Sequence, residues 1–241
     1  AIGNGTLVTG AYGVALGQQA KVDKDFSSAI GYKAEANSSG SAAIGAWAKT
    51  SGGDSAALGN HAEASGFKSL ALGNSTKAIG SESLALGLLA EASGSASNAI
   101  GWKAKATAQD ATAIGSSAKA DGKNAIVLGT NSFVQDEDSI AIGSGATVKS
   151  DNLGISRNSI AFGTNAKVKG GNSTAIGWLA DTGDGGGMLA IGDQASTNNT
   201  SAGANNNQSV ALGSRALAFG DQSVAIGNDV KASGNSSVAI G

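Results

Sequence analysis

The side chains of this 241-residue chain best suited to binding a partner are a few large apolar ones, in a sequence rich in alanine, serine and asparagine. Large aromatic and aliphatic side chains on a polar surface are typical binding hot spots, so these are candidates for contacting another protein. The alternative, that they cover turns or neighbouring subunits, stays open at this point. The candidates are Tyr32, Trp47, Leu88, Leu89, Trp102, Trp178 and Leu179.

Residues that could support catalysis are scarce. The chain has no cysteine, one histidine, His61, and no phosphate-binding loop motif. Its acidic residues follow the phase of a repeat instead of converging on one site, so we expect no enzyme, no catalytic residue and no cofactor. The segment Asp181-Thr182-Gly183-Asp184-Gly185 has a faint likeness to a calcium loop, but it lacks the required acids and spacing. We therefore expect no metal site.

Charge and hydropathy exclude further classes of partner. The formal net charge of −2 predicts neither a nucleic-acid partner nor binding to anionic lipid. No apolar stretch is long enough to span a bilayer, so we expect no membrane contact by this segment. The sequence has no signal peptide and both ends cut through a repeat unit, which leads us to expect a fragment of a longer protein.

The elements that must position these side chains are set by a repeat. An aliphatic or phenylalanine residue is followed by an anchor glycine seventeen times. Ten consecutive steps of 14 residues run from Gly3 to Gly143, and the later steps are 20, 14, 15, 21, 14 and 14 residues. A short unit cannot bury its own apolar face and must stack on its neighbours, so the sequence predicts a solenoid of about 17 coils that forms a single domain over 1–241. The anchors are Gly3, Gly17, Gly31, Gly45, Gly59, Gly73, Gly87, Gly101, Gly115, Gly129, Gly143, Gly163, Gly177, Gly192, Gly213, Gly227 and Gly241.

Each unit predicts two short strands. Counted from the anchor glycine, position −1 is Ile, Leu or Phe and position −2 is Ala in every unit except at Val127, a short apolar run that favours a strand. After the glycine, +3 and +5 are small and apolar while +2 and +4 are mostly polar, which predicts a strand with one wet face. A second glycine often stands at +7, where we expect it to supply a turn conformation. Two glycines per unit would cost about 1 kcal/mol each in a helix, so helix is excluded.

Position +4 tests whether the coils stack in register. Stacked strands would bring these charges of alternating sign together as a ladder on a solvent-facing side. The alternative is a solvated row whose order is accidental. The residues are Lys21, Glu35, Lys49, Glu63, Lys77, Glu91, Lys105 and Lys119.

The first strand of each unit is apolar on both faces, because −1 and −2 point in opposite directions. One face can line the coil interior, but the other needs a cover. An apolar stripe along a whole solenoid exceeds what a soluble monomer exposes. We therefore expect a homo-oligomer whose subunit number the residues alone leave open.

The recurring block Ser-x-Ala-Ile-Gly-x-x-Ala resembles the head repeats of YadA-like trimeric autotransporter adhesins. It occurs at 27–34 and 41–48, with variants at 223–230 and 237–241. The resemblance implies an all-β, left-handed parallel β-roll of three identical chains, displayed on the bacterial cell surface beyond the outer membrane. It also implies binding to extracellular matrix proteins of the fibronectin, laminin or collagen class, or to host-cell receptors, with no enzymatic activity.

Three interruptions of the period are predicted to form loops. The extra residues fall near 151–157, within 197–207 and around 184–188. Loops of solenoids tolerate both drift and function, so both readings stay open. The candidate ligand-binding residues in these loops are Asn152, Arg157, Asn199 and Asn205.

Other solenoid classes fit less well. Hexapeptide acyltransferases use a period of six, and calcium-binding nonapeptide repeats need a nine-residue rhythm; neither is present. A passive structural spacer or an ice-binding solenoid remains the alternative function. An ice binder would show a uniform column such as threonine, whereas +2 and +4 are mixed and charged.

Overall fold

The computed structural model describes residues 1–149, 157–197 and 208–241. It divides into two compact units, Ala1–Ser117 and Ala118–Gly241. Throughout the described residues the regular secondary structure is β-strand, without helix, which confirms the all-β prediction. The single domain over 1–241 stays a prediction.

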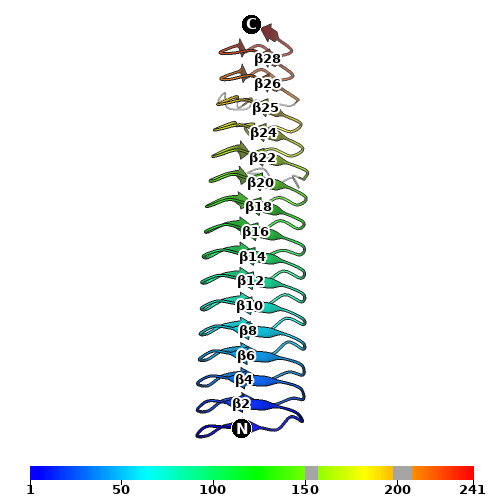
Figure 1. Ribbon diagram of the computed structural model, residues 1–241. Coiled ribbons are helices and arrows are strands. Elements are labelled where there is room, and N and C mark those ends of the chain that lie inside the picture. Colours follow the sequence, from blue (N-terminus) through cyan, green and yellow to red (C-terminus); the bar gives the residue numbers. More distant parts are fainter. Residues whose placement is uncertain (150–156, 198–207) are drawn as a thin grey trace. The chain divides into compact units, whose positions relative to one another are not determined.

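In the first unit the strands form two parallel sheets (Figure 1). We call the sheet of three-residue strands the apolar sheet and the sheet of two-residue strands the ladder sheet. The apolar sheet contains β2 (Val14–Leu16), β4 (Ser28–Ile30), β6 (Ala42–Ile44), β8 (Ala56–Leu58), β10 (Leu70–Leu72), β12 (Leu84–Leu86), β14 (Asn98–Ile100) and β16 (Thr112–Ile114). The ladder sheet contains β1 (Leu7–Val8), β3 (Lys21–Val22), β5 (Glu35–Ala36), β7 (Lys49–Thr50), β9 (Glu63–Ala64), β11 (Lys77–Ala78), β13 (Glu91–Ala92) and β15 (Lys105–Ala106).

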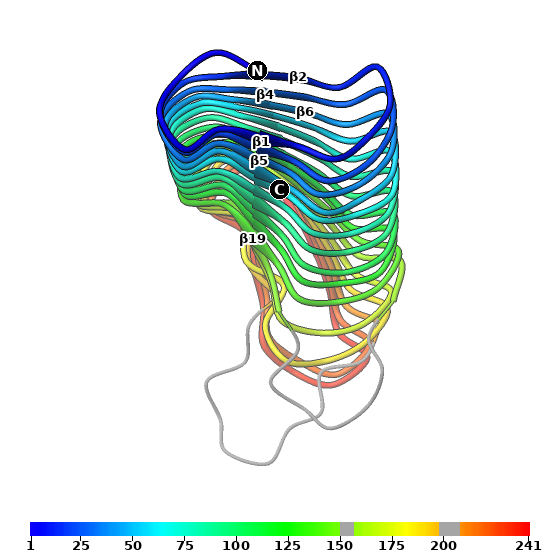
Figure 2. The same ribbon diagram turned by 90° about the horizontal axis from the view of Figure 1, so that it is seen from below.

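Partners in both sheets of the first unit are 14 residues apart. Leu70 pairs with Leu84, for example, and Lys77 pairs with Glu91. Seen along the stack, β2, β4 and β6 follow one long side of a flattened coil, and β1 and β5 follow the other (Figure 2). Each 14-residue unit is therefore one coil with two strands and two turns, as the repeat predicts.

The second unit has an apolar sheet of the same kind, whereas its ladder strands are divided between two sheets, the last two strands forming a sheet of their own. Its apolar sheet contains β18 (Ile126–Leu128), β20 (Ile140–Ile142), β22 (Ile160–Phe162), β24 (Thr174–Ile176), β25 (Leu189–Ile191), β26 (Val210–Leu212), β28 (Val224–Ile226) and β30 (Val238–Ile240). Its ladder strands are β17 (Lys119–Ala120), β19 (Phe133–Val134), β21 (Thr147–Val148), β23 (Lys167–Val168), β27 (Leu217–Ala218) and β29 (Lys231–Ala232). Isolated parallel bridges join Lys167 to Asp181, Asp181 to Ser196 and Ser196 to Leu217.

The three longer steps do not disturb the apolar sheet of the second unit. Ile140 pairs with Ile160 across the 20-residue step, and Leu189 pairs with Val210 across the 21-residue step. Thr174 pairs with Leu189 across the 15-residue step. The apolar strands therefore stay in register across all three steps, as expected when a solenoid carries insertions.

The interior of the coil is filled by small side chains. Alanines at −2 and +3, such as Ala57 and Ala62, are 0% exposed. Most serines at −4 are also buried. Ser55 donates to the Gly52 carbonyl at 2.6 Å and Ser69 to the Gly66 carbonyl at 2.8 Å, whereas the hydroxyl groups of Ser83 and Ser223 have no hydrogen-bond partner among the described residues. The two strands of a coil therefore lie too close for larger side chains, which explains why alanine recurs at −2.

Glycine has a different role at each of its two repeat positions. The anchor glycines have φ between 126° and 145°, a region that other residues rarely adopt. At +7 the expectation of a turn conformation is wrong, because Gly66 has no positive φ; a Cβ there would lie 1.9 Å from the carbonyl oxygen of Gly80 in the next coil. Close approach of backbones thus explains glycine at +7, although other coils accommodate Lys24 or Ser38 there.

Residues other than glycine occupy the left-handed turn positions. At +2, Trp47 and Leu89 have φ of 55° and 60°, and at +9, Phe26 and Asp54 have φ of 56° and 52°. Left-handed φ costs each residue with a Cβ some free energy, which the paired strands on either side must offset. Here it recurs from coil to coil, so it belongs to the fold and does not mark a functional site.

The predicted ladder of charges forms in the first unit. Glu35 pairs in register with both Lys21 and Lys49, and ion pairs join Lys49 to Glu35 at 4.0 Å and Lys105 to Glu91 at 3.1 Å. These side chains are one third to one half exposed, so each pair contributes only a few tenths of a kcal/mol. The in-register stacking is confirmed.

Removing one rung of the ladder should change stability little. Lys77 is exposed and stacks between Glu63 and Glu91. We expect Lys77→Ala to change the free energy of unfolding by less than about 0.5 kcal/mol, because exposed pairs are screened by water and salt. Chemical denaturation monitored by circular dichroism measures this change. A loss several times larger would show that the ladder, and not the coil interior, holds the sheet together.

Candidate functional site

The described residues contain no group of three or more His, Cys, Asp or Glu side chains that could hold a metal ion. Asp181, in the segment with the faint likeness to a calcium loop, accepts a hydrogen bond from the Gly183 amide at 2.8 Å and lies 4.0 Å from the Lys169 ammonium. Its carboxylate therefore has protein partners of its own. No helix in the described part of the chain is long and apolar enough to cross a membrane.

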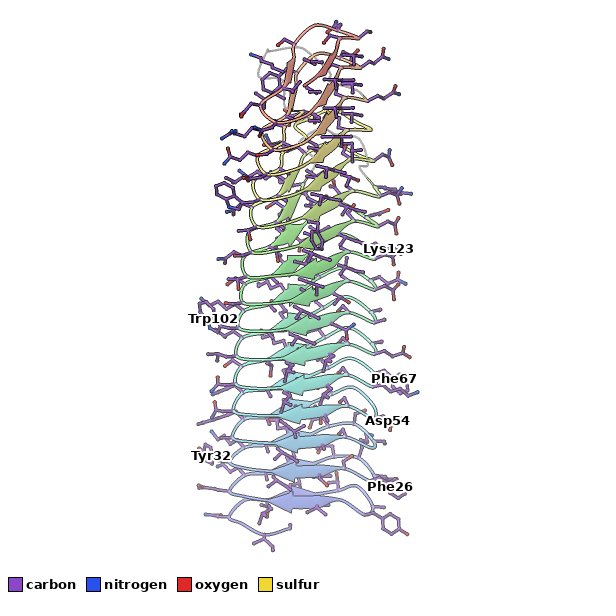
Figure 3. The ribbon with its side chains drawn as sticks, turned by 45° about the horizontal axis from the view of Figure 1, so that its top comes forward. Phe26, Tyr32, Asp54, Phe67, Trp102 and Lys123 are labelled. Atoms are coloured by element: carbon purple, nitrogen blue, oxygen red, sulfur yellow. The ribbon has the colours of Figure 1, made fainter. Side chains whose placement is uncertain are left out.

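Exposed side chains are the candidate site instead. In the first unit, Tyr32 and Trp102 lie on one edge of the coils, whereas Phe26 and Phe67 lie on the opposite edge (Figure 3). We call the edge formed by the turns at +1 and +2 the anchor edge, and the edge formed by the turns at +8 and +9 the second edge.

An aromatic column forms on the anchor edge. The Trp47 ring packs edge-on against Tyr32, with centroids 5.0 Å apart, and stacks on His61 at 4.9 Å with an interplanar angle of 6°. The three residues come from successive coils, so the stacking of coils produces the column. His61, the one histidine of the chain, is thus a member of this column.

Leu88, Leu89 and Trp102 form a second group on the anchor edge. They are 41–47% exposed and come from adjacent coils, in which the Lys103 amide donates to the Leu88 carbonyl at 2.9 Å. The Lys103 ammonium lies 4.4 Å from the centroid of the Trp102 ring, a cation–π contact. The structure thus brings these three predicted residues together.

The remaining described candidates lie in the second unit. Trp178 is 49% exposed and Leu179 is 38% exposed, in the turn that follows the anchor glycine. Arg157 forms a parallel bridge with Glu137 and an ion pair with its carboxylate at 2.9 Å, so it occupies a regular place in the stack. Asn152, Asn199 and Asn205 lie outside the described residues.

Sequence reasoning missed the aromatic residues of the second edge. Tyr12 and Phe26 are 82% and 68% exposed and stack with ring centroids 5.1 Å apart. Phe67 is 48% exposed, with the Lys68 ammonium 5.0 Å from its ring centroid. The sequence could have indicated these residues, because they occupy +8 and +9, the positions of the second turn of the coil.

The outer face of the apolar sheet carries a row of exposed aliphatic side chains in the first unit. The alanines at −2 point inward, so the residues at −1 and −3 point outward; the sequence did not decide between these orientations. Leu72 is 40% exposed, Leu86 is 37% exposed and Val14 is 51% exposed. A continuous row of this kind indicates a surface for self-association.

These features define a class of protein: an all-β parallel solenoid with 14-residue coils and exposed apolar and aromatic surfaces. A family model described as the YadA head domain repeat (2 copies) matches residues 1–20, 9–34, 36–62, 64–90, 92–118, 106–132, 120–146, 137–152, 156–180 and 204–229. These segments cover most of the chain, which therefore belongs to the YadA head repeat family. The resemblance seen in the sequence is confirmed.

One solved structure similar to this chain is the collagen-binding domain of the Yersinia adhesin YadA. The two chains are 26% identical over 63% of this chain and 69% of the other, with a TM-score of 0.45. No curated protein matches this chain.

Proposed function

We propose that this chain is the adhesive head of a bacterial surface fibre, assembled from three copies and projected from the outer membrane. It attaches the cell to host tissue by binding extracellular matrix proteins of the fibronectin, laminin or collagen class, or a host-cell receptor. The observation that carries the proposal is the match of YadA head repeats along most of the chain.

The exposed face of the apolar sheet supports assembly into an oligomer. In the first unit its outward side chains at −1 include Leu16, Ile44 and Ile114, which are 44%, 38% and 38% exposed. Covering such a face with copies of itself removes apolar surface from water at about 25 cal/mol per Å². A threefold arrangement lets each chain cover part of the next and closes on itself, as cyclic symmetry requires.

Assembly through the apolar sheet leaves the turns for ligands. The aromatic column with Trp47 and the group with Trp102 project from the anchor edge, not from the apolar sheet. Three chains carry three copies of each group. Once one contact has formed, the other linked sites are held near the ligand at a high effective concentration. A ligand with repeated structure is therefore retained far longer than a single contact would allow.

The alternative functions require no host ligand. A passive spacer has no need for exposed aromatic residues such as Trp102. An ice-binding solenoid needs a uniform column, but +2 in the first unit includes Lys33, Trp47, His61 and Leu89. The aromatic groups on the edges therefore favour the adhesin over both alternatives.

A binding panel tests the proposed function. The purified full chain is applied to surfaces coated with fibronectin, laminin or collagen, to host cells and to ice. We expect saturable binding to at least one matrix protein or to cells and none to ice. Variants with the 151–157 and 197–207 loops shortened to the regular period, together with Trp178→Ala, map the site. A chain that binds no matrix protein and no cell refutes the proposed function.

Trp102 should be a strong contributor to ligand binding. We expect Trp102→Ala to weaken binding of the recognised ligand about tenfold or more, as truncation of an exposed aromatic anchor does. The matched control is Phe67→Ala on the second edge, which removes a ring of similar exposure, 48% against 47%. Titration in the same binding assay measures both. If Phe67→Ala weakened ligand binding and Trp102→Ala did not, the ligand would bind at the second edge and the anchor edge would be rejected as the binding site.

A further inference from the structure

Two open depressions of one kind lie beside the ladder sheet of the first unit. Lys21, Lys33 and Lys49 line one, with a volume of about 510 Å³. The other has a volume of about 320 Å³ and is lined by another three lysines, Lys77, Lys103 and Lys105. One carboxylate lines each depression, Glu35 in the first and Glu91 in the second.

The second unit has a third depression of the same kind. Lys149, Lys167 and Lys169 line it at the outer side of β21 and β23, together with Thr147 and Val168. No acidic residue is among the residues that line it. The three depressions together take up nine lysines of a chain that has 16 basic residues.

Stacking of coils produces these clusters, and the first shows how. Positions +2 and +4 point to the same side of the second strand, because side chains alternate along it. Coils stack about 4.8 Å apart, so lysines at +4 of every second coil, such as Lys21 and Lys49, lie about 9.6 Å apart. A lysine at +2 of the coil between them, here Lys33, completes the triad. In the second, Lys103 stands at +2 of the same coil as Lys105, and in the third Lys149 and Lys169 stand at +6.

Local acids only partly neutralise the lysines. In the first depression Lys21 pairs with Asp23 at 2.6 Å and Lys49 with Glu35 at 4.0 Å, while the Lys33 ammonium lies 5.3 Å from the Tyr32 ring centroid. The hydrogen bond to Asp23 is the main reason that the pKa of Lys21 is raised above its ordinary value, so this ammonium stays charged.

The opposite edge of the first unit is mostly acidic. Its turns carry Asp25, Asp54, Glu82 and Asp110 against Lys24 and Lys68. The net charge of −2 therefore averages over local clusters of lysine on the outer face of the ladder sheet, which also carries Glu35, Glu63 and Glu91, and a mostly acidic edge. The expectation of no nucleic-acid or anionic-lipid partner, drawn from the net charge, stays a prediction, because net charge does not describe local clusters of lysine.

We propose that the outer face of the ladder sheet binds a linear sulfated polysaccharide through its lysine triads. The proposal rests on the proposed function, since it names a ligand class for the adhesive head. Lysine ammonium groups act as compact point charges, which suits the single charges of sulfate groups. Triads recurring along a stack suit a linear chain with regularly repeated anionic groups.

The structure favours a polysaccharide over other polyanions. A single-stranded nucleic acid is bound largely by stacking bases on free aromatic faces. The Trp47 ring beside the first depression instead packs between Tyr32 and His61. Surface binding to anionic lipid is typical of amphipathic helices, and the described residues form none. The ladder sheet also stays accessible when the apolar sheet is covered by other copies.

The test measures binding of the full chain to immobilised heparin at several salt concentrations. Desulfated heparin, double-stranded DNA and phosphatidylserine vesicles are the other probes. We expect binding to heparin that weakens as salt rises, and weak or no binding to the other three. The variant Lys33→Gln/Lys77→Gln/Lys103→Gln spares the lysines that pair with Asp23, Glu35 and Glu91, and it should weaken heparin binding about tenfold or more.

The matched control removes the same charge from the second turns of the coils. Lys24→Gln/Lys68→Gln/Lys123→Gln should change heparin binding less than about twofold, because these substitutions remove only long-range electrostatic attraction and no lysine of a triad. The proposal would be overturned if both triple variants lost heparin binding equally. It would also be overturned if the wild-type chain bound desulfated heparin, DNA or vesicles as tightly as heparin. Absence of heparin binding with retained binding to a matrix protein refutes the polysaccharide site alone. Absence of both refutes the proposed function as well.

Discussion

Replacing Gly59 by alanine should destabilise the protein by about 3 kcal/mol or more, since two independent penalties apply. Gly59 is an anchor glycine with a φ of 140°, a conformation that residues with a Cβ rarely adopt. A Cβ there would also lie 2.1 Å from the carbonyl oxygen of Gly73 in the next coil. Backbone atoms cannot rotate away, so two coils would have to separate and lose their hydrogen bonds. Chemical denaturation measures the change.

The control for this prediction is Gly53→Ala in the same unit. Gly53 has no positive φ, and a Cβ there would meet the Phe67 ring at 3.3 Å and the Ser38 hydroxyl oxygen at 3.8 Å, both of them side-chain atoms. That exposed ring can move, so we expect a change below about 1 kcal/mol. Equal effects of the two substitutions would show that the anchor glycine has no special role in stacking the coils.

The second large effect is expected on the oligomeric state. Leu72→Asp/Leu86→Asp should convert the trimer into single chains, because it places two carboxylates per chain on the face that we propose to be covered. Leu72 and Leu86 are 40% and 37% exposed in the single chain, so the coil itself can accommodate the change. Burying unpaired carboxylates between subunits is strongly unfavourable. Light scattering should fall from about three times to once the chain mass of 23.1 kDa.

The matched control carries the same charges elsewhere. Leu88 and Leu89 are 45% and 41% exposed but lie on the anchor edge. Leu88→Asp/Leu89→Asp should therefore keep the mass of the trimer. A wild-type chain with the mass of one chain, or dissociation of both variants alike, contradicts assembly through the apolar sheet.

Sequence periodicity predicts the coil well because one short unit repeats with little change. The two strands, the stacking register and the ladder at +4 all follow from the 14-residue period. Lys77, for example, pairs with Glu63, which is 14 residues earlier. The insertions follow too, since a solenoid can place extra residues only outside its paired strands. The family was also recognisable from the repeated block at residues 27–34.

Periodicity does not decide which way a side chain faces. Alanine at −2 and leucine at −1 are both apolar, so either could fill the interior. The narrow coil takes small side chains there, Ala85 in one coil and Val127 in another, and places Leu86 outside. The reason for glycine at +7 was also beyond the sequence. A glycine is needed at position 66 because the backbone of the next coil passes close to it, and this approach is visible only in the structure.

The candidate site was found only in part from the sequence. Large residues at +1 and +2, such as Trp102, stand out in a polar chain and are exposed as expected. The aromatic contacts between coils were not foreseen: the stack of His61 on Trp47 depends on ring orientation. The lysine triads escaped notice because net charge averages over the lysine clusters and the acidic edge, and only stacking brings Lys33 beside Lys21 and Lys49.

Attachment of beads coated with the full chain tests most directly the claim that this chain is the adhesive head of a trimeric fibre. Beads carrying the wild-type chain are passed under flow over host cells and matrix-coated surfaces, beside beads carrying the Leu72→Asp/Leu86→Asp variant and beads carrying an inert protein. We predict that the wild-type beads attach to cells or to a matrix protein and that the variant beads detach much faster, because single chains lose avidity. Wild-type beads that attach no better than inert beads to every surface would contradict the account.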